Sequence, residues 1–311
     1  MRHLPRGTLL IWVSVGLSGI VALLFWSGLS VWRFSHRVTV AFIGRPVSIL
    51  SFDPENQDVT IILLSPDHGA QAVNGYGIYT LSSLWSLGTL EKKEGKILTE
   101  SLSEAVGLPI SSYVGPTSDV LADSPNPLEL FTSYTVMQRV LSGTFQTDAS
   151  LMTLLLFTRA LRSVVAQNIR LVDLTSAAVT RNESLPDESV RMVLDEGKID
   201  AKLAHIFESS RMRSEDIRLS VVNTTSVSGL AQRAARTMGN LGMIVTSIEN
   251  DEPPIDECLI ITKSVYTKAY TIRRLAILFD CAIRQVNELE RVEAQVRIGN
   301  TYARKFSPSV N

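Results

Sequence analysis

The sequence predicts an α/β protein in three parts: an N-terminal transmembrane helix, a mixed α/β domain, and a C-terminal two-layer βαββαβ module. Three observations lead to this prediction. An uncharged apolar run opens the chain, β-rich and amphipathic segments alternate through its middle, and the final third shows strand and helix patterns in a regular order. A length of 311 residues has room for two domains of ordinary size.

The apolar run from Leu9 to Trp32 contains no charged residue. About 20 helical residues cross the hydrocarbon core of a bilayer. A cleaved signal peptide has a shorter apolar core of about 7–15 residues, followed by a small-residue cleavage site, whereas Arg33 follows this run. We therefore expect 1–8 to be an N-terminal tail and 9–32 a single-pass anchor in the cytoplasmic membrane. Arginines flank the run almost equally, so charge alone does not orient it, but the free amino terminus favours an extracytoplasmic C-terminal part.

Composition excludes several classes of function. The net charge of −1 gives no electrostatic case for nucleic-acid binding. The four histidines are scattered and the only cysteines are Cys258 and Cys281, so the spacing of a structural zinc site is missing. The two cysteines could pair in an oxidising compartment. Two separate buried thiols, packed as small apolar groups, are the preferred interpretation.

The domain expected over 38–210 begins with β-rich segments at 38–44, 46–52 and 58–64, the last two forming a hairpin. The stretch 67–77 has the composition of a loop, and helical spacing follows around Trp85.

Further helices are expected at 97–107, 128–140 and 150–165, followed by a strand at 168–174 and a polar loop at 181–189. In the first of these helices, Glu100 and Glu104 are expected to form a solvated face. Arginines directly follow the apolar part of 150–165, so that helix is interpreted as a buried core helix rather than a second span.

The module expected over 215–306 contains strands at 217–223, 243–250, 257–264 and 294–300, with two amphipathic helices between them. The turn NTTSVSG after the first strand has one glycine and no lysine, so it lacks the pattern of a phosphate-binding loop. We expect Ser226 or Ser228 to cap the following helix and Gly229 to let that helix approach the strand.

Candidate chemistry is confined to a few polar side chains. Asp67 follows a strand, where it could bind a metal ion or orient His68; an ordinary turn is the alternative. Arg159 and Arg162 share a helix face and could join Arg170 around an anion such as pyrophosphate. A solvated or salt-bridged face is the alternative for these arginines.

Two segments resemble known families. SVVNTTSVSGLAQRAARTMGNLGMIVTSIEN and the closing VEAQVRIGNTY resemble the C-terminal domain of LytR-type proteins, although Thr301 stands where that family tends to have an acidic residue. VTVAFIGRPVSILSFDPENQDVTIILLSPDHG and ILTESLSEAVGLPISSYV resemble the LytR-CpsA-Psr catalytic domain. Enzymes of that family are membrane-anchored and move glycopolymers from a polyprenyl-pyrophosphate carrier to peptidoglycan, with arginines, acidic residues and a divalent metal at the site.

The sequence departs from this family where the family has Pro-Arg-Asp-Thr, because here the text is SPDH around Asp67. The resemblance therefore implies a membrane-anchored extracytoplasmic cell-envelope protein that is non-catalytic and binds or supports the assembly of cell-wall polymer. Its expected partners are the membrane and peptidoglycan or a polyprenyl-linked glycan. The alternative is a glycopolymer phosphotransferase in which Asp67 holds Mg²⁺ and Arg159 and Arg162 contact the pyrophosphate; no other cofactor is implied.

Overall fold

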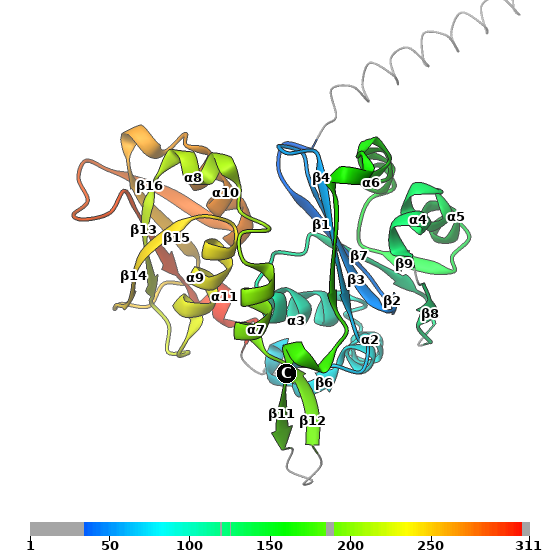
Figure 1. The fold of residues 1–311 in the computed structure, drawn as a ribbon. Helices are drawn as coiled ribbons and strands as arrows, with labels where there is room; N and C mark the ends of the chain where they lie inside the picture. Colours follow the sequence, from blue (N-terminus) through cyan, green and yellow to red (C-terminus); the bar gives the residue numbers. More distant parts are fainter. Residues whose placement is uncertain (1–33, 119, 125, 185–189, 307–311) are drawn as a thin grey trace, which may run out of the picture.

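The computed structural model describes residues 34–118, 120–124, 126–184 and 190–306, which form two α/β bodies side by side (Figure 1). The chain passes from the core of the first body to that of the second between Phe207 and Met212. The expected tail and anchor lie outside the described residues. Within the described ranges, no helix is both long and apolar enough to cross a membrane.

The first body is built on a six-stranded sheet with the order β10-β4-β3-β1-β7-β9. The strands β1, β3 and β4 form an antiparallel meander, which confirms the predicted hairpin, while β10 joins β4 and β7 joins β1 in parallel. Every residue of β1 and β3 is buried, as in strands that are covered on both faces. The bounds are β1 (Val38–Phe42), β3 (Val47–Asp53), β4 (Asp58–Leu64), β7 (Ser112–Pro116), β9 (Phe145–Thr147) and β10 (Ile169–Leu174).

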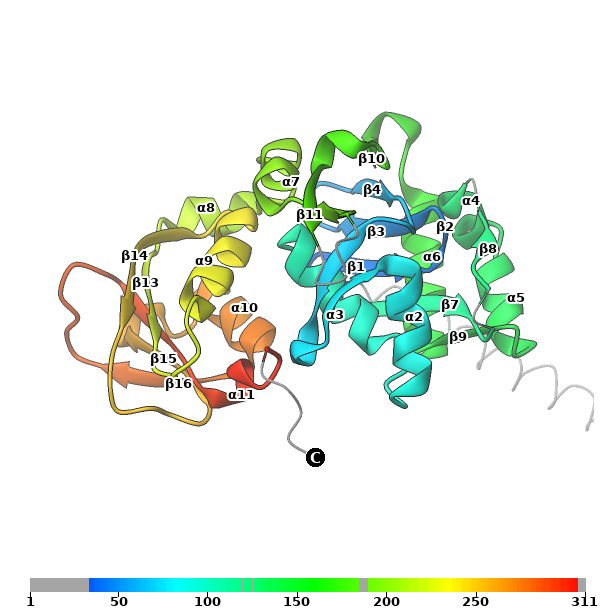
Figure 2. The same cartoon turned by 90° about the horizontal axis from the view of Figure 1, so that it is seen from below.

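Helices pack on both faces of this sheet (Figure 2). One face is covered by α2 (Leu81–Leu90) and α3 (Lys96–Val106), and the other by α4 (Pro127–Thr132), α5 (Thr135–Leu141) and α6 (Leu151–Ser163). Trp85 is fully buried on the first face. The helix predicted over 128–140 is broken into α4 and α5, because Tyr134 adopts a left-handed φ of 63°.

Side-chain caps explain where several of these helices begin. Ser150 accepts the Thr153 N–H at the start of α6, and Asp195 accepts the Lys198 N–H at the start of α7 (Glu196–Leu203). Leu154, Phe157 and Leu161 of α6 are buried, so the predicted core helix is amphipathic and has one exposed face.

Two smaller sheets complete the first body. The segment 67–77 is not a loop, because it forms most of an antiparallel hairpin whose small residues give little strand signal. Of the predicted loop 181–189, residues 181–184 lie in a strand, and 185–189 lie outside the described residues. The four-stranded sheet has the order β11-β12-β5-β6, with β5 (Gly69–Ala72), β6 (Gly77–Thr80), β11 (Thr180–Ser184) and β12 (Val190–Leu194); β2 (Gly44–Arg45) pairs with β8 (Ala122–Asp123). Short 3-10 turns lie at Val73–Gly75, Ala166–Asn168 and Ala177–Val179.

The second body is a five-stranded sheet of order β14-β13-β17-β15-β16 with helices packed on one face (Figure 2). Its order along the chain is βαββαββ, one strand more than predicted. The extra strand, β16, is exposed along the sheet edge and lacks a buried alternation. The elements are α8 (Ser210–Glu215), β13 (Arg218–Asn223), α9 (Leu230–Asn240), β14 (Ile244–Asn250), β15 (Cys258–Lys263), the 3-10 turn Ser264–Tyr266, α10 (Tyr270–Phe279), β16 (Cys281–Val286), β17 (Ala294–Ile298) and α11 (Asn300–Ala303).

The parallel register of β15 and β16 places Cys258 opposite Cys281, and the two form a disulfide. The expectation of two separate buried thiols is therefore wrong. The error follows from the unrecognised strand, since without β16 nothing in the sequence brought the two cysteines together.

Candidate functional site

Asp67 lies exposed in the turn after β4, where its backbone N–H donates to Ser65 Oγ at 3.3 Å. The neighbouring His68 is buried. Burial lowers the pKa of His68 below its ordinary value, although the Asp67 carboxylate acts in the opposite direction. Its Nδ1 atom has no hydrogen-bond partner among the described residues. His68 is thus a neutral core side chain, and Asp67 faces solvent.

The three candidate arginines lie at the opposite end of the central sheet. Arg170 of β10 pairs in register with Thr60, near the start of β4, whereas Asp67 lies three residues beyond the end of that strand. The four strand residues between Thr60 and Leu64 alone span roughly 13 Å. Arg162, in the last turn of α6, precedes the start of β10 by a short connection.

The immediate contacts of Arg162 lie within the first body. Its guanidinium donates to the Thr132 carbonyl at 3.0 Å and lies 5.0 Å from the centre of the Tyr134 ring. Arg159 is exposed on the same helix. The structure brings the arginines to one end but does not bring Asp67 to them. Within the described ranges, no group of three or more His, Cys, Asp or Glu side chains could hold a metal ion, and the metal-binding role of Asp67 stays a prediction.

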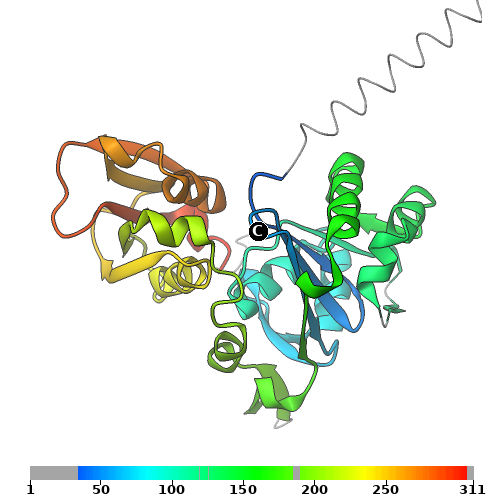
Figure 3. The ribbon, with the colours of Figure 1, turned by 45° about the horizontal axis from the view of Figure 1, so that its top comes forward.

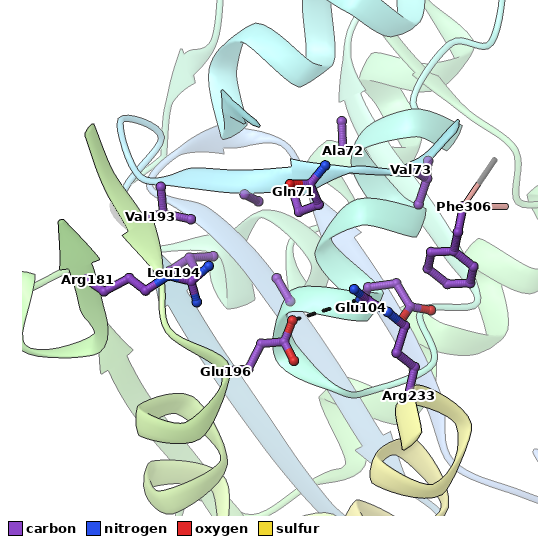
Figure 4. Close-up of a pocket in the computed structure, with 12 residues that line it drawn as sticks. Gln71, Ala72, Val73, Glu104, Arg181, Val193, Leu194, Glu196, Arg233 and Phe306 are labelled. Carbon is purple, nitrogen blue, oxygen red and sulfur yellow. Dashed lines mark ion pairs between the residues drawn. The ribbon is translucent and has the colours of Figure 1, made fainter. Parts of the chain in front are cut away.

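A crevice between the two bodies gathers a set of charges (Figure 4). Glu104 of α3 and Glu196 of α7 each lie 4.0 Å from the guanidinium of Arg233 on α9. Tyr302 of α11 donates its hydroxyl to Glu104 at 3.4 Å. Glu104 was expected on a solvated face, and that expectation is wrong because the second body covers this side of α3.

Burial raises the pKa of Glu104, and the nearby Arg233 guanidinium opposes this shift. Burial likewise raises the pKa of Tyr302, and the Glu104 carboxylate adds to that increase. Since Arg233 faces both carboxylates and also stacks on the Phe306 ring at 5.1 Å, the charges of the crevice are mutually satisfied. The crevice is therefore part of the interface between the two bodies.

A second hollow opens where the parallel strands β13 and β14 end, a position at which α/β sheets commonly bind ligands. Asn223 shapes it: its Oδ1 accepts the Thr225 N–H at 3.0 Å and its Nδ2 donates to the Val227 carbonyl at 2.9 Å. The hollow has a volume of about 590 Å³. Its lining is almost wholly polar: Asn223, Thr224, Thr225, Ser226, Ser228, Asn250, Asp251, Glu252 and Pro254. We call it the strand-end hollow.

The serines of this hollow do not act as predicted. Gly229 itself occupies the N-cap position of α9, with a left-handed φ of 80° and no side-chain cap. A Cβ atom at Gly229 would meet no neighbour within 4 Å, so the glycine is needed for its backbone conformation rather than for close packing. Ser226 and Ser228 are therefore exposed and line the hollow. Sequence reasoning missed the contribution of Asn250 and the residues after it, which only the parallel pairing reveals.

Comparison with known proteins identifies a family for one part of the chain. The family model described as LytR cell envelope-related transcriptional attenuator matches residues 216–302. No curated protein matches the chain. Among solved structures, Bacillus subtilis TagV is similar with a TM-score of 0.38 and 9% identity, covering 55% of this chain and 95% of TagV. B. subtilis TagT has a TM-score of 0.36 and 12% identity, with coverages of 54% and 89%.

Another TagT structure, described as a LytR-CPS2A-psr family protein with bound octaprenyl pyrophosphate lipid, has a TM-score of 0.36 and 11% identity and covers 54% of this chain and 88% of TagT. Likeness at this level carries no argument about the site of the first body. The family match, by contrast, spans nearly the whole second body, from the end of α8 to α11. The second body of this chain is a LytR C-terminal domain.

Proposed function

We propose that this chain is a membrane-anchored, extracytoplasmic protein of the cell envelope that is non-catalytic and binds cell-wall glycan. The observation that carries the proposal is the strand-end hollow of the LytR C-terminal domain, where exposed serines and the exposed amide of Asn250 lie at the ends of two parallel strands. Its volume of about 590 Å³ is in the range of small-ligand sites.

The chemistry of the hollow favours an uncharged sugar. Hydroxyl and amide side chains both donate and accept hydrogen bonds, as sugar hydroxyls and acetamido groups do. The lining residues include Asp251 and Glu252 but no lysine or arginine. Arg297 donates to Asp251 at 2.7 Å and lowers its pKa, so this carboxylate stays ionised. Because Arg297 pairs with Asp251 and no lysine or arginine belongs to the lining, the hollow offers no free cation to a phosphate-rich polymer, and its polar lining favours the amino-sugar backbone of peptidoglycan.

Three observations support a membrane-anchored, extracytoplasmic location. The disulfide between Cys258 and Cys281 is of the kind that persists in oxidising compartments. The uncharged run at 9–32 has the length of a membrane span. The matched family is also described as related to the cell envelope.

The phosphotransferase alternative has less support. It requires Asp67, with a divalent metal, close to Arg159 and Arg162 around a pyrophosphate, whereas these residues lie at opposite ends of the central sheet. Lipid binding in the TagT structure is a property of TagT. The weak structural similarity between TagT and this chain does not extend that binding to this chain. A carrier-release assay with polyprenyl-pyrophosphate-linked glycan, Mg²⁺ and an acceptor tests this alternative. Release that disappears in Asp67→Ala would favour the enzyme.

Retention of the full chain on purified peptidoglycan tests the proposal directly. The double variant Ser226→Ala, Ser228→Ala should bind about fivefold more weakly, because it removes two hydroxyls worth about 1 kcal/mol of net hydrogen bonding in total. Ser264→Ala is the matched control, since that serine is exposed in a 3-10 turn and does not line the hollow. Equal binding by all three proteins, or no retention of the unmodified chain, would contradict the proposal.

A further inference from the structure

The described chain begins at Phe34, at one end of the first body, and Phe34 is close in sequence to the apolar run. Phe34 lies 6.4 Å from the Phe52 ring, centre to centre, and packs into the same core cluster as Val164 and Ile169. Phe34 is the second residue after Trp32, the last residue of the run. A fully extended chain covers about 7 Å in two residues. If the run spans the bilayer, as the proposed function requires, this end of the body lies at the membrane surface.

Cationic side chains gather at this same end. The last turns of α6 carry Arg159 and Arg162, and the start of β10 carries Arg170. Between them, Val165 is 59% exposed. Figure 1 and Figure 3 show α6 standing beside the start of β1, on the side from which the chain enters the body. We call these three arginines with Val165 the α6–β10 end.

The carboxylates nearby are already held by other groups. Arg37 donates to Asp53 at 2.6 Å and lies 3.8 Å from Asp58. Burial raises the pKa of Asp58, while Arg37 and Arg170 act in the opposite direction. Glu55 accepts the Ser209 hydroxyl of the second body at 3.1 Å. Asp53 is therefore buried and paired, Asp58 faces Arg37, and Glu55 is exposed but bonded to the second body, so the exposed arginines of the α6–β10 end are not paired with these carboxylates.

We infer that the α6–β10 end binds the headgroup phosphates of an anionic phospholipid surface. Guanidinium groups suit phosphate oxygens because their planar donors form paired hydrogen bonds. An exposed valine between the arginines can enter the headgroup layer without leaving a polar group unpaired. Basic side chains next to an anchor each contribute about fivefold to the attraction for an anionic surface. The same arginines that suggested a pyrophosphate site thus act as lipid contacts, remote from Asp67.

The test places a photoreactive benzoylphenylalanine in the full chain, reconstituted in phosphatidylglycerol or phosphatidylcholine vesicles. Replacing Val165 should give lipid adducts, several-fold more in phosphatidylglycerol. Replacing Val190 is the control, because that valine is similarly exposed at 64% but lies in the β11–β12 hairpin at the far end of the body (Figure 1). Adding Arg159→Glu and Arg170→Glu should reduce the adducts at Val165 at least tenfold, while the matching Lys variants should retain most of them.

Flotation of the chain with the vesicles separates this inference from the proposed function. A chain that floats but gives no adduct at Val165, or equal adducts at Val165 and Val190, overturns the lipid contact alone. Equal adducts in the two lipids at Val165 would mean proximity without charge recognition and would also overturn it. A chain that does not float refutes the anchor itself, while glycan retention through the strand-end hollow is measured independently.

Discussion

The contact between the two bodies depends heavily on Arg236 of α9. Its guanidinium pairs with both carboxylate oxygens of Asp200, Nε to Oδ2 at 2.7 Å and Nη2 to Oδ1 at 2.8 Å. It also donates to the backbone carbonyls of Glu104 and Ala105, at the C-terminal end of α3. A cation is favourable there because the carbonyl groups of a helix end carry partial negative charge. The side chain is only 14% exposed.

We predict that Arg236→Ala destabilises the full chain by about 3 kcal/mol. Hydrogen bonds to a charged group are worth about 1.5–3 kcal/mol each, but they are not additive, and Asp200 keeps some solvent access. A loss of this size corresponds to a fall in melting temperature of about 5–10 °C. Calorimetry of the detergent-solubilised chain measures it. Because the lost bonds join the two bodies, their unfolding should also separate into two transitions.

The matched control is Arg218→Ala. Arg218 makes an equally bidentate pair with Glu293, at 2.8 Å and 3.1 Å, but the Arg218 side chain is 53% exposed and the pair lies within the second body. Solvent screening makes exposed pairs weak, so this variant should unfold close to the unmodified chain and in the same manner. If Arg236→Ala lowers the free energy of unfolding no more than Arg218→Ala does, burial between the two bodies does not strengthen the Arg236 contact, and the reasoning is refuted.

Three further predictions concern stability. Burial raises the pKa of Glu104. Its contribution to stability is therefore fully present below the ordinary carboxyl pKa and is lost as pH rises through the raised value. In a pH series, the free energy of unfolding of Glu104→Gln should equal that of the unmodified chain in acid and exceed it at neutral pH. The disulfide closes a sequence separation of 23 residues, so Cys258→Ser with Cys281→Ser should cost about 3 kcal/mol in urea unfolding. Gly95→Ala would place a Cβ against the Tyr113 ring at a φ of 67°. It should cost at least about 2 kcal/mol more than Gly143→Ala, whose φ of 74° is similar but whose surroundings are open.

Local patterns were sufficient for much of the fold. The strands at the start of the first body, the helix that ends at Gly107 and the stripe of Leu230, Ala234 and Met238 all appear as predicted. These segments bury one face or both, so the period of their apolar residues reflects the structure directly. The edge strand β16 has no such period because most of its side chains are exposed.

The candidate sites depended on contacts that no local pattern records. The sequence pattern of α3 predicts that Glu104 is a surface residue, whereas in the structure the second body packs against it. The sequence predicts that Ser226 or Ser228 caps the helix. In the structure, Gly229 occupies the N-cap position with a left-handed backbone, so neither serine caps it. The arginines near α6 share a helix face as predicted, but their distance from Asp67 is set by the register of β10 on β4, which is a long-range pairing.

The two proposed surfaces face opposite ends of the molecule, and this follows from the order of the elements. Ser209, at the start of α8, contacts Glu55 in the turn between β3 and β4, so the second body begins at the membrane end of the first. From there β13 runs away from that end, and its residues from Arg218 to Asn223 cover about 16 Å. Under the proposed anchoring, the strand-end hollow therefore opens on the side away from the bilayer, where wall glycan would lie. Under the two proposals, one chain would contact the membrane at one end and wall glycan at the other, and the contacts of Arg236 and Glu104 would join the two bodies between them.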